Sequence, residues 1–176
     1  SSSSAASDVY KRQAQMYKGK ADWTLIGEVK RNPRMHIPVI GNGDITHPAE
    51  AKEAFDRYGV DGIMIGRAAV GRPWLFGHTR HFLDSGELLP DPSVEEKVEL
   101  AKLHFSKSLA CKSAPVGVYE MRRHFSSYFR GLPHFREMRL KLLTSLDIEE
   151  IFSILDRISE TYGHHRPEVN GSFWDR

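Results

Sequence analysis

Cysteine is nearly absent from this sequence, as are long apolar runs and any strong excess of charge of one sign. The 176 residues include one cysteine, so no internal disulfide can form, which fits a reducing compartment such as the cytoplasm. No run of about 18 apolar residues occurs, so we expect no membrane-spanning helix. The nine histidines and the cysteine show no metal-ligand spacing, and we expect no metal site.

The length and the two ends of the sequence restrict the fold further. A complete (β/α)8 barrel takes about 250 residues, which is more than the 176 present. Residues 1–13 hold five serines, few apolar residues and no apolar core of a signal peptide, so we interpret them as a disordered leader that is not native to the fold. Residues 164–176 read as a flexible tail. A net charge of +2 is typical of an ordinary soluble protein, and we expect a monomer.

Short helices and strands alternate within residues 14–86. The elements expected, in chain order, are helix 21–31, strand 37–40, helix 48–58, strand 60–65 and a helix running toward His81. Both strands are short, β-branched and closed by glycine, as buried strands are. Parallel strands need crossover helices and are buried on both faces, so we predict a parallel α/β architecture.

The strand signal stops after residue 86. Four helices are predicted over residues 93–112, 116–130, 135–145 and 148–162. Ser93 and Glu96 form a capping box at the start of the first helix. A compact helical bundle over residues 87–163 is therefore expected. The fold class is α/β plus all-α.

The turns that follow the two strands are the candidate site. Ligands of parallel sheets bind at the carboxyl ends of the strands, where glycine lets the backbone approach a phosphate and arginine can bind it through paired hydrogen bonds. The turn residues are Asn42, Gly43 and Asp44 after the first strand, and Gly66 and Arg67 after the second. Together these residues predict a phosphate-binding site.

A purely structural interpretation of these turns stays open. Glycine after a strand is common turn chemistry. Asp44, Asn42 or Thr46 can cap the following helix, and Arg67 can be a surface cation paired with Asp61.

Basic residues concentrate in one stretch of the helical half. Residues 118–141 hold six lysines and arginines against two acids, which is the charge pattern expected of a surface that binds a nucleic-acid backbone. Aromatic residues in the same stretch could stack on unpaired bases. For Phe125 and Phe129 we favour a place in the helical core.

Several motifs together closely resemble the tRNA-dihydrouridine synthases, nearest the bacterial B-type branch. They are IPVIGNGDI at residues 37–45, DGIMIGRAAVGRPWLF at residues 61–76, QMY at 15–17 with ADW at 21–23, and RRH at 122–124 with Tyr128. The resemblance runs from about residue 14 to residue 162. It implies the last βα units of an FMN-dependent TIM (β/α)8 barrel, followed by a helical domain that binds tRNA. It also implies reduction of uridine to 5,6-dihydrouridine with NADPH or NADH.

The resemblance assigns roles to individual residues. It places Asn42, Gly43 and Asp44 on the turn after the seventh barrel strand, and Gly66 and Arg67 on the turn after the eighth, where they hold the FMN phosphate. Arg122 and Arg123 match the helix that faces tRNA. For Gly71-Arg72-Pro73-Trp74 we favour a structural role, because proline starts helices and tryptophan is usually a core residue.

The reacting groups of the family have no counterpart here. Relatives carry a catalytic cysteine in a loop of the first half of the barrel, whereas Cys111 lies late in the first helix of the helical half, where we expect a buried or half-buried residue. We therefore assign no catalytic residue and interpret the sequence as a fragment. Two alternatives remain: a fragment of another FMN barrel oxidoreductase, such as a dihydroorotate dehydrogenase-like enzyme, or a non-catalytic RNA-binding module.

Overall fold

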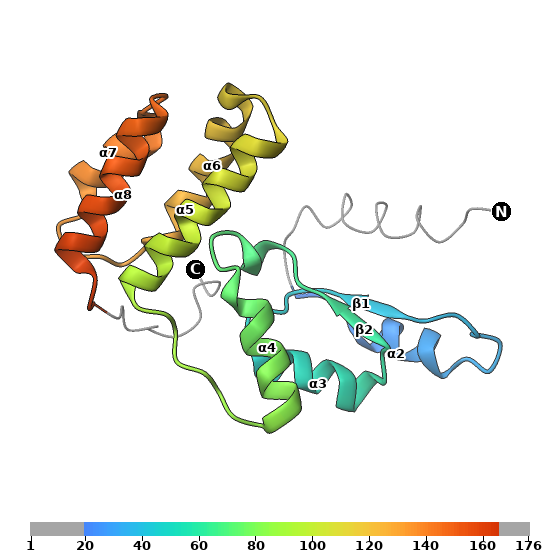
Figure 1. Cartoon of the computed structure of the whole chain (residues 1–176). Helices are drawn as coiled ribbons and strands as arrows, with labels where there is room; N and C mark the ends of the chain where they lie inside the picture. The colour runs from blue at the N-terminus through green and yellow to red at the C-terminus, as the bar shows by residue number, and fades with distance from the viewer. Residues whose placement is uncertain (1–19, 166–176) are drawn as a thin grey trace. The chain divides into compact units, whose positions relative to one another are not determined.

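The computed structural model describes residues 20–165, which form two compact units (Figure 1). We call residues 20–68 the α/β unit and residues 69–165 the helical unit. The division falls after Ala68, whereas the sequence predicted it after residue 86. The predicted leader, motif residues 15–17 and residues 166–176 of the predicted tail lie outside the described range.

The α/β unit contains the predicted parallel strand pair. Its elements are α2 (Thr24–Arg31), β1 (Ile40–Asn42), α3 (Pro48–Tyr58), β2 (Gly62–Met64) and the 3-10 turn η1 (Arg67–Ala69), which reaches the boundary. The strands pair in parallel, with Ile40 opposite Gly62 and Asn42 opposite Met64. Helix α3 is the crossover between them, so both strands end at the same edge, as the predicted parallel architecture requires.

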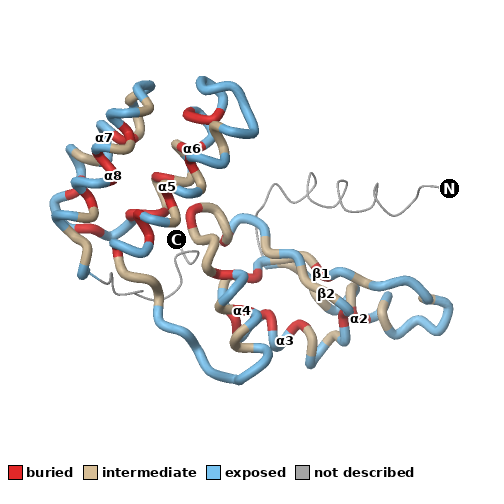
Figure 2. The backbone as a smooth tube through the Cα atoms, viewed as in Figure 1, coloured by how far each residue is buried: buried red, intermediate tan, exposed pale blue. Residues whose placement is uncertain are grey.

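Only one face of this strand pair is buried. Ile63 and Ile65 pack against the small cluster around Ile45, while Ile40 and Met64 are 59% and 55% exposed. Side chains alternate along a strand, and nothing within residues 20–68 covers the second face (Figure 2). The prediction of strands buried on both faces is therefore wrong for this chain.

Strand β1 runs from Ile40 to Asn42, so it begins later than the predicted residues 37–40 and includes Asn42, which the sequence placed on the following turn. Before its first residue, the Asp61 carboxylate takes the place of a backbone carbonyl as the acceptor for Val39. The backbone N–H of Val39 donates to the Asp61 carboxylate at 2.8 Å, and the Asp61 N–H donates to the Val39 carbonyl at 2.9 Å. Lys30 of α2 donates to the same carboxylate at 2.6 Å. The Lys30 hydrogen bond, followed by the Val39 N–H, lowers the pKa of Asp61. Asp61 thus ties α2 to the start of both strands.

Helix α3 spans the predicted residues but is capped by a different one. His47 is the N-cap, and its ring nitrogen accepts the Ala49 N–H at 3.2 Å. The Glu50 carboxylate accepts the N–H groups of His47 and Thr46, at 3.1 and 2.7 Å, which completes a capping box. The predicted caps, Asn42, Asp44 and Thr46, are therefore wrong.

The helical unit contains the four predicted helices and one that the sequence assigned to the barrel. Its elements are α4 (Trp74–Ser85), α5 (Val94–Cys111), α6 (Ala114–Tyr128), α7 (Arg136–Thr144) and α8 (Ile148–Tyr162). Helix α5 packs against α6 and α8, and α7 packs against the same two helices. The capping box at α5 is confirmed, since Ser93 N donates to Glu96 at 2.6 Å and Glu96 N donates to Ser93 at 3.2 Å.

Aromatic side chains form much of the core of the helical unit. Phe105, Phe125 and Phe129 are at most 2% exposed, and the rings of Phe105 and Phe125 meet edge to face with centroids 5.6 Å apart. Burial of such side chains is the main stabilising contribution in a small helical domain. The core assignment of Phe125 and Phe129 is confirmed, and neither ring is available to a base.

Helix α4 belongs to the helical unit because the turn before it packs on α6. Gly71 has a φ of +67°, and a Cβ there would lie 2.5 Å from the Ser127 Cβ and 2.6 Å from the His124 carbonyl oxygen. The Trp74 ring lies 5.9 Å from the ring of Tyr128. Pro73 is the N-cap of α4, so the structural role expected for this motif is confirmed. These contacts explain why the boundary between the α/β unit and the helical unit lies before α4.

Burial lowers the pKa of two half-buried histidines of the helical unit, His104 and His124. The Gly71 N–H donates to Nδ1 of His124 at 3.3 Å, and the His104 ring lies 4.5 Å from the His124 ring. Burial lowers the pKa of both side chains, and for His124 the charges of His104 and Arg123 lower it further while Glu120 opposes them. Protonation of His124 replaces an acceptor by a second donor facing Gly71.

We therefore expect the helical unit to lose stability in mild acid. The folded-state pKa of each histidine lies below the ordinary 6.5. At a pH between that folded-state pKa and 6.5, the unfolded chain therefore binds more protons than the folded chain. The stabilisation is complete above pH 6.5 and is lost as the pH falls through the folded-state values. Melting temperatures measured from pH 7.5 downward should fall, and less steeply in His124→Asn, whose amide oxygen keeps an acceptor near Gly71. An equal pH dependence in both proteins contradicts this account.

Candidate functional site

The two strand-end turns meet beyond the carboxyl edge of the strand pair. The Arg67 guanidinium donates to Oδ1 of Asp44 at 2.6 Å, and the two side chains are 47% and 37% exposed. The register of β1 and β2 produces this contact, because the segments that follow the two strands leave the sheet at the same edge. The alternative pairing of Arg67 with Asp61 is wrong, since Asp61 is bonded to Lys30 and Val39.

Asp44 orients the guanidinium of Arg67. It adopts a φ of +49°, a left-handed conformation that aspartate tolerates better than most residues. Its second oxygen, Oδ2, accepts the backbone N–H of Ala21 at 2.8 Å. The carboxylate is therefore anchored on one side and holds Arg67 on the other.

Gly41 of β1 and Gly43 of the turn after it are required by packing. A Cβ on Gly41 would lie 2.3 Å from Cζ3 of Trp23, and one on Gly43 would lie 2.4 Å from the Cβ of Ala21. Trp23 also donates from Nε1 to the Gly43 carbonyl at 3.0 Å. The segment before α2 thus occupies the space that the sequence interpretation left for a ligand. Trp23 is the site residue that the sequence analysis missed, although the ADW motif contains it.

Gly66 is where the backbone is open. A Cβ there would meet nothing within 4 Å, and within residues 20–165 no hydrogen bond links the Asn42 side-chain amide to another group. Gly66, Arg67 and Asn42 therefore make the anion-accessible part of the site, supported by Asp44 and by the Gly43 turn. This arrangement of an open glycine and an oriented guanidinium fits a phosphate group.

The two arginines predicted to face RNA have different environments. The Arg122 guanidinium stacks over the Tyr119 ring at 4.8 Å and donates to the Thr144 carbonyl at 3.0 Å. Its Nε is buried and has no partner among the described atoms. Arg122 therefore links α6 to the end of α7, whereas Arg123 lies exposed on the same helix. Of the two, Arg123 is the side chain that solvent reaches freely.

Cys111 differs from its prediction. It is exposed, because it is the last residue of α5 and the core side of that helix is formed by other positions. Within residues 20–165 no group of three or more His, Cys, Asp or Glu side chains could hold a metal ion. None of the described helices is long and apolar enough to cross a membrane.

We predict that Gly41 of β1 and Gly66 of the turn after β2 differ in their tolerance of substitution by alanine. Gly41→Ala places a methyl group against the rigid Trp23 ring and should lower the free energy of unfolding by about 1–3 kcal/mol. Gly66→Ala meets no atom and should change it by at most about 0.5 kcal/mol. Urea denaturation of both variants measures this difference, and equal losses contradict the packing argument.

Comparison with known proteins identifies the family. Residues 11–158 match the family model described as dihydrouridine synthase (Dus). A probable tRNA-dihydrouridine synthase of Rickettsia conorii is 43% identical over 127 residues, 72% of this chain and 38% of that protein. The tRNA-dihydrouridine synthase B proteins of Pseudomonas putida and Proteus vulgaris are 38% and 40% identical, over 73% and 84% of this chain and 38% and 45% of theirs. The chain spans about two fifths of the length of these relatives, and it belongs to the dihydrouridine synthase family.

Proposed function

We propose that this chain is part of an FMN-dependent tRNA-dihydrouridine synthase, which reduces uridine in tRNA to 5,6-dihydrouridine with NADPH or NADH as reductant. In this proposal the α/β unit is the last part of the family's TIM barrel and the helical unit binds tRNA. The observation that carries the proposal is the Asp44–Arg67 pair at the carboxyl edge of the parallel strands. Phosphate sites of (β/α)8 barrels are frequent at the corresponding edge, after the last two strands.

The strand-end residues would hold the phosphate of FMN. Arg67 would bind it through its guanidinium, Gly66 would let the backbone approach and Asn42 would donate from its amide. Asp44 would act by orienting Arg67, and Gly43 by holding the turn against Trp23. When bound, the flavin supplies the hydride chemistry; the described residues bind and orient its phosphate end.

The helical unit would supply the contacts to tRNA. Arg123 is exposed and would bind a phosphate, whereas Arg122 would contribute mainly by fixing α6 against α7. An RNA-binding module without flavin is a second candidate, because the helical unit has a hydrophobic core of its own. Flavin absorbance in the purified protein separates the two, since only the first predicts it.

We predict that the chain binds tRNA and that Arg123→Gln weakens this binding. Loss of one phosphate contact should lower the affinity several-fold and reduce the slope of log K against log salt concentration by about one. Arg157→Gln is the matched control, because Arg157 is also exposed and lies on α8. Fluorescence anisotropy with labelled tRNA at several salt concentrations gives both quantities. Equal affinities for the two variants argue against Arg123 as a tRNA contact.

We also predict that the isolated 176-residue chain forms no dihydrouridine. The proposal assigns no catalytic residue to it, since Cys111 is exposed at the end of α5 and does not belong to a strand-end turn. Reduction needs a hydride donor and a proton donor placed together. Incubation with FMN, NADPH and unmodified tRNA, followed by nucleoside mass spectrometry, tests this. Turnover by the chain alone contradicts the assignment.

A further inference from the structure

The turn between α6 and α7 contains a basic pocket that neither the sequence motifs nor the proposed site includes. Its volume is about 340 Å³. It is lined by Phe129, Arg130, Gly131, Leu132, His134, Phe135, Arg136 and Arg139. None of these residues is acidic, and we call them the α6–α7 pocket.

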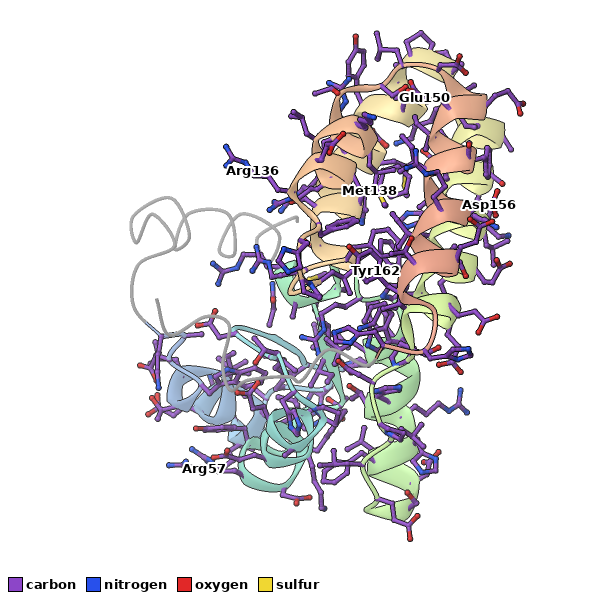
Figure 3. The ribbon with its side chains drawn as sticks, turned by 90° about the vertical axis from the view of Figure 1, so that its left-hand side faces the viewer. Arg57, Arg136, Met138, Glu150, Asp156 and Tyr162 are labelled. Carbon is purple, nitrogen blue, oxygen red and sulfur yellow. The ribbon has the colours of Figure 1, made fainter. Side chains whose placement is uncertain are left out.

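The floor of the pocket is apolar and its rim is cationic. Phe129, Leu132 and Phe135 are 2%, 8% and 6% exposed, so their rings and side chains belong to the core. The three arginines are exposed. Figure 3 shows Arg136 extending away from the helices, whereas Met138 of the same helix points inward, where it packs against the core. A ligand therefore meets guanidinium groups first.

The lining of the pocket contains no acidic side chain beside Arg136 and Arg139. Arg139 donates to the neutral hydroxyl of Ser126 at 2.8 Å, and no hydrogen bond or ion pair joins Arg136 to another residue of the described range. The nearby Glu137 is paired with Lys141 at 3.6 Å. Burial and the charge of Arg139 lower the pKa of Arg130, as expected for cations that repel each other. A bound anion would relieve this repulsion.

The start of α7 contributes further partial positive charge beside the three arginines. Its N-cap is Phe135, which makes no side-chain cap hydrogen bond and lines the pocket, and the N–H groups of a first helical turn carry partial positive charge. Guanidinium groups bind phosphate oxygens in paired geometry. The buried floor offers no exposed ring on which a base could stack, so the chemistry favours a backbone phosphate over a base.

We infer that the α6–α7 pocket binds a backbone phosphate of the tRNA through Arg130, Arg136 and Arg139. This inference rests on the proposed function, which supplies the RNA. It adds a contact on the α6–α7 turn to the one proposed for Arg123 within α6. Two separated phosphate contacts would restrain the orientation of the RNA on the helical unit, since phosphate contacts set register and orientation.

The test compares Arg136→Gln and Arg136→Glu with Arg157→Gln in the full 176-residue chain. Arg136 is chosen because it is exposed and its side chain makes no hydrogen bond or ion pair within residues 20–165, and circular dichroism checks that the variants fold. Anisotropy with labelled tRNA should show a several-fold weaker affinity and a salt slope smaller by about one for Arg136→Gln. Arg136→Glu should lose more, and Arg157→Gln should match the unsubstituted chain. Arg130→Gln, at the opposite side of the turn, should repeat the result.

The outcomes separate this inference from the proposed function. If the unsubstituted chain binds tRNA and the pocket variants bind as tightly as Arg157→Gln, the inference is wrong and the proposed function stands. If the unsubstituted chain binds no tRNA, both fail. The third measurement uses labelled polyglutamate. The inference would be overturned if the unsubstituted chain bound polyglutamate, and if Arg136→Gln abolished that binding while its tRNA affinity stayed unchanged. The pocket would then be assigned to an acidic peptide.

Discussion

The parallel pairing of β1 and β2 is the constraint on which the candidate site depends. Because Asn42 lies opposite Met64, the segments that follow β1 and β2 leave the sheet side by side. The next few residues bring Asp44 and Arg67 into hydrogen-bond contact. Asp61 stabilises the other end of the pair by bonding the Val39 backbone and the Lys30 side chain. A shift of one residue in this register would separate the carboxylate from the guanidinium and turn the apolar side chains to the other face.

At this edge of the strand pair, different residues serve packing and the proposed phosphate contact. Gly41 and Gly43 accommodate Trp23 and Ala21, whose segment precedes α2, so these glycines stabilise the α/β unit. Gly66 is open, and next to it Arg67 is oriented by an anchored carboxylate. A preorganised cation loses less conformational freedom on binding than a mobile one, so the Asp44–Arg67 pair would favour the proposed phosphate contact.

In the helical unit, position relative to the core separates basic residues that look alike in sequence. Arg122 stacks on Tyr119 and bonds the carbonyl of Thr144, so its removal would disturb the joint between α6 and α7. Arg123 and Arg136 lie on the outside. A charged side chain can bind a phosphate at little cost only where it is not already desolvated by its own fold, and this distinction selects the surface proposed for RNA.

Local features of the sequence predicted much of the fold. The ends of α3 and α8, the Ser93–Glu96 capping box and the parallel order of the strands depend on neighbouring residues and short-range periodicity, and all were predicted. Asn42 was predicted on a turn and is instead the last residue of β1. The positions of Gly43, Asp44, Gly66 and Arg67 just beyond the two strands did follow from strand ends marked by glycine. The exposure of Cys111, the His47 cap and the packing of α4 on α6 were not predicted, because each depends on contacts or packing that the residue pattern does not encode.

The sequence by itself determined the helices, the two strands, their parallel order and the family motifs. Only the tertiary structure decided that Arg67 pairs with Asp44 rather than Asp61, and that Trp23 fills the space beside Gly41 and Gly43. It also decided that Arg122 contacts Tyr119 and Thr144, whereas Arg136 lies at the rim of a pocket. Helix and strand formation depend on a few consecutive residues, whereas the partner of a long side chain depends on where elements separated by many residues come together.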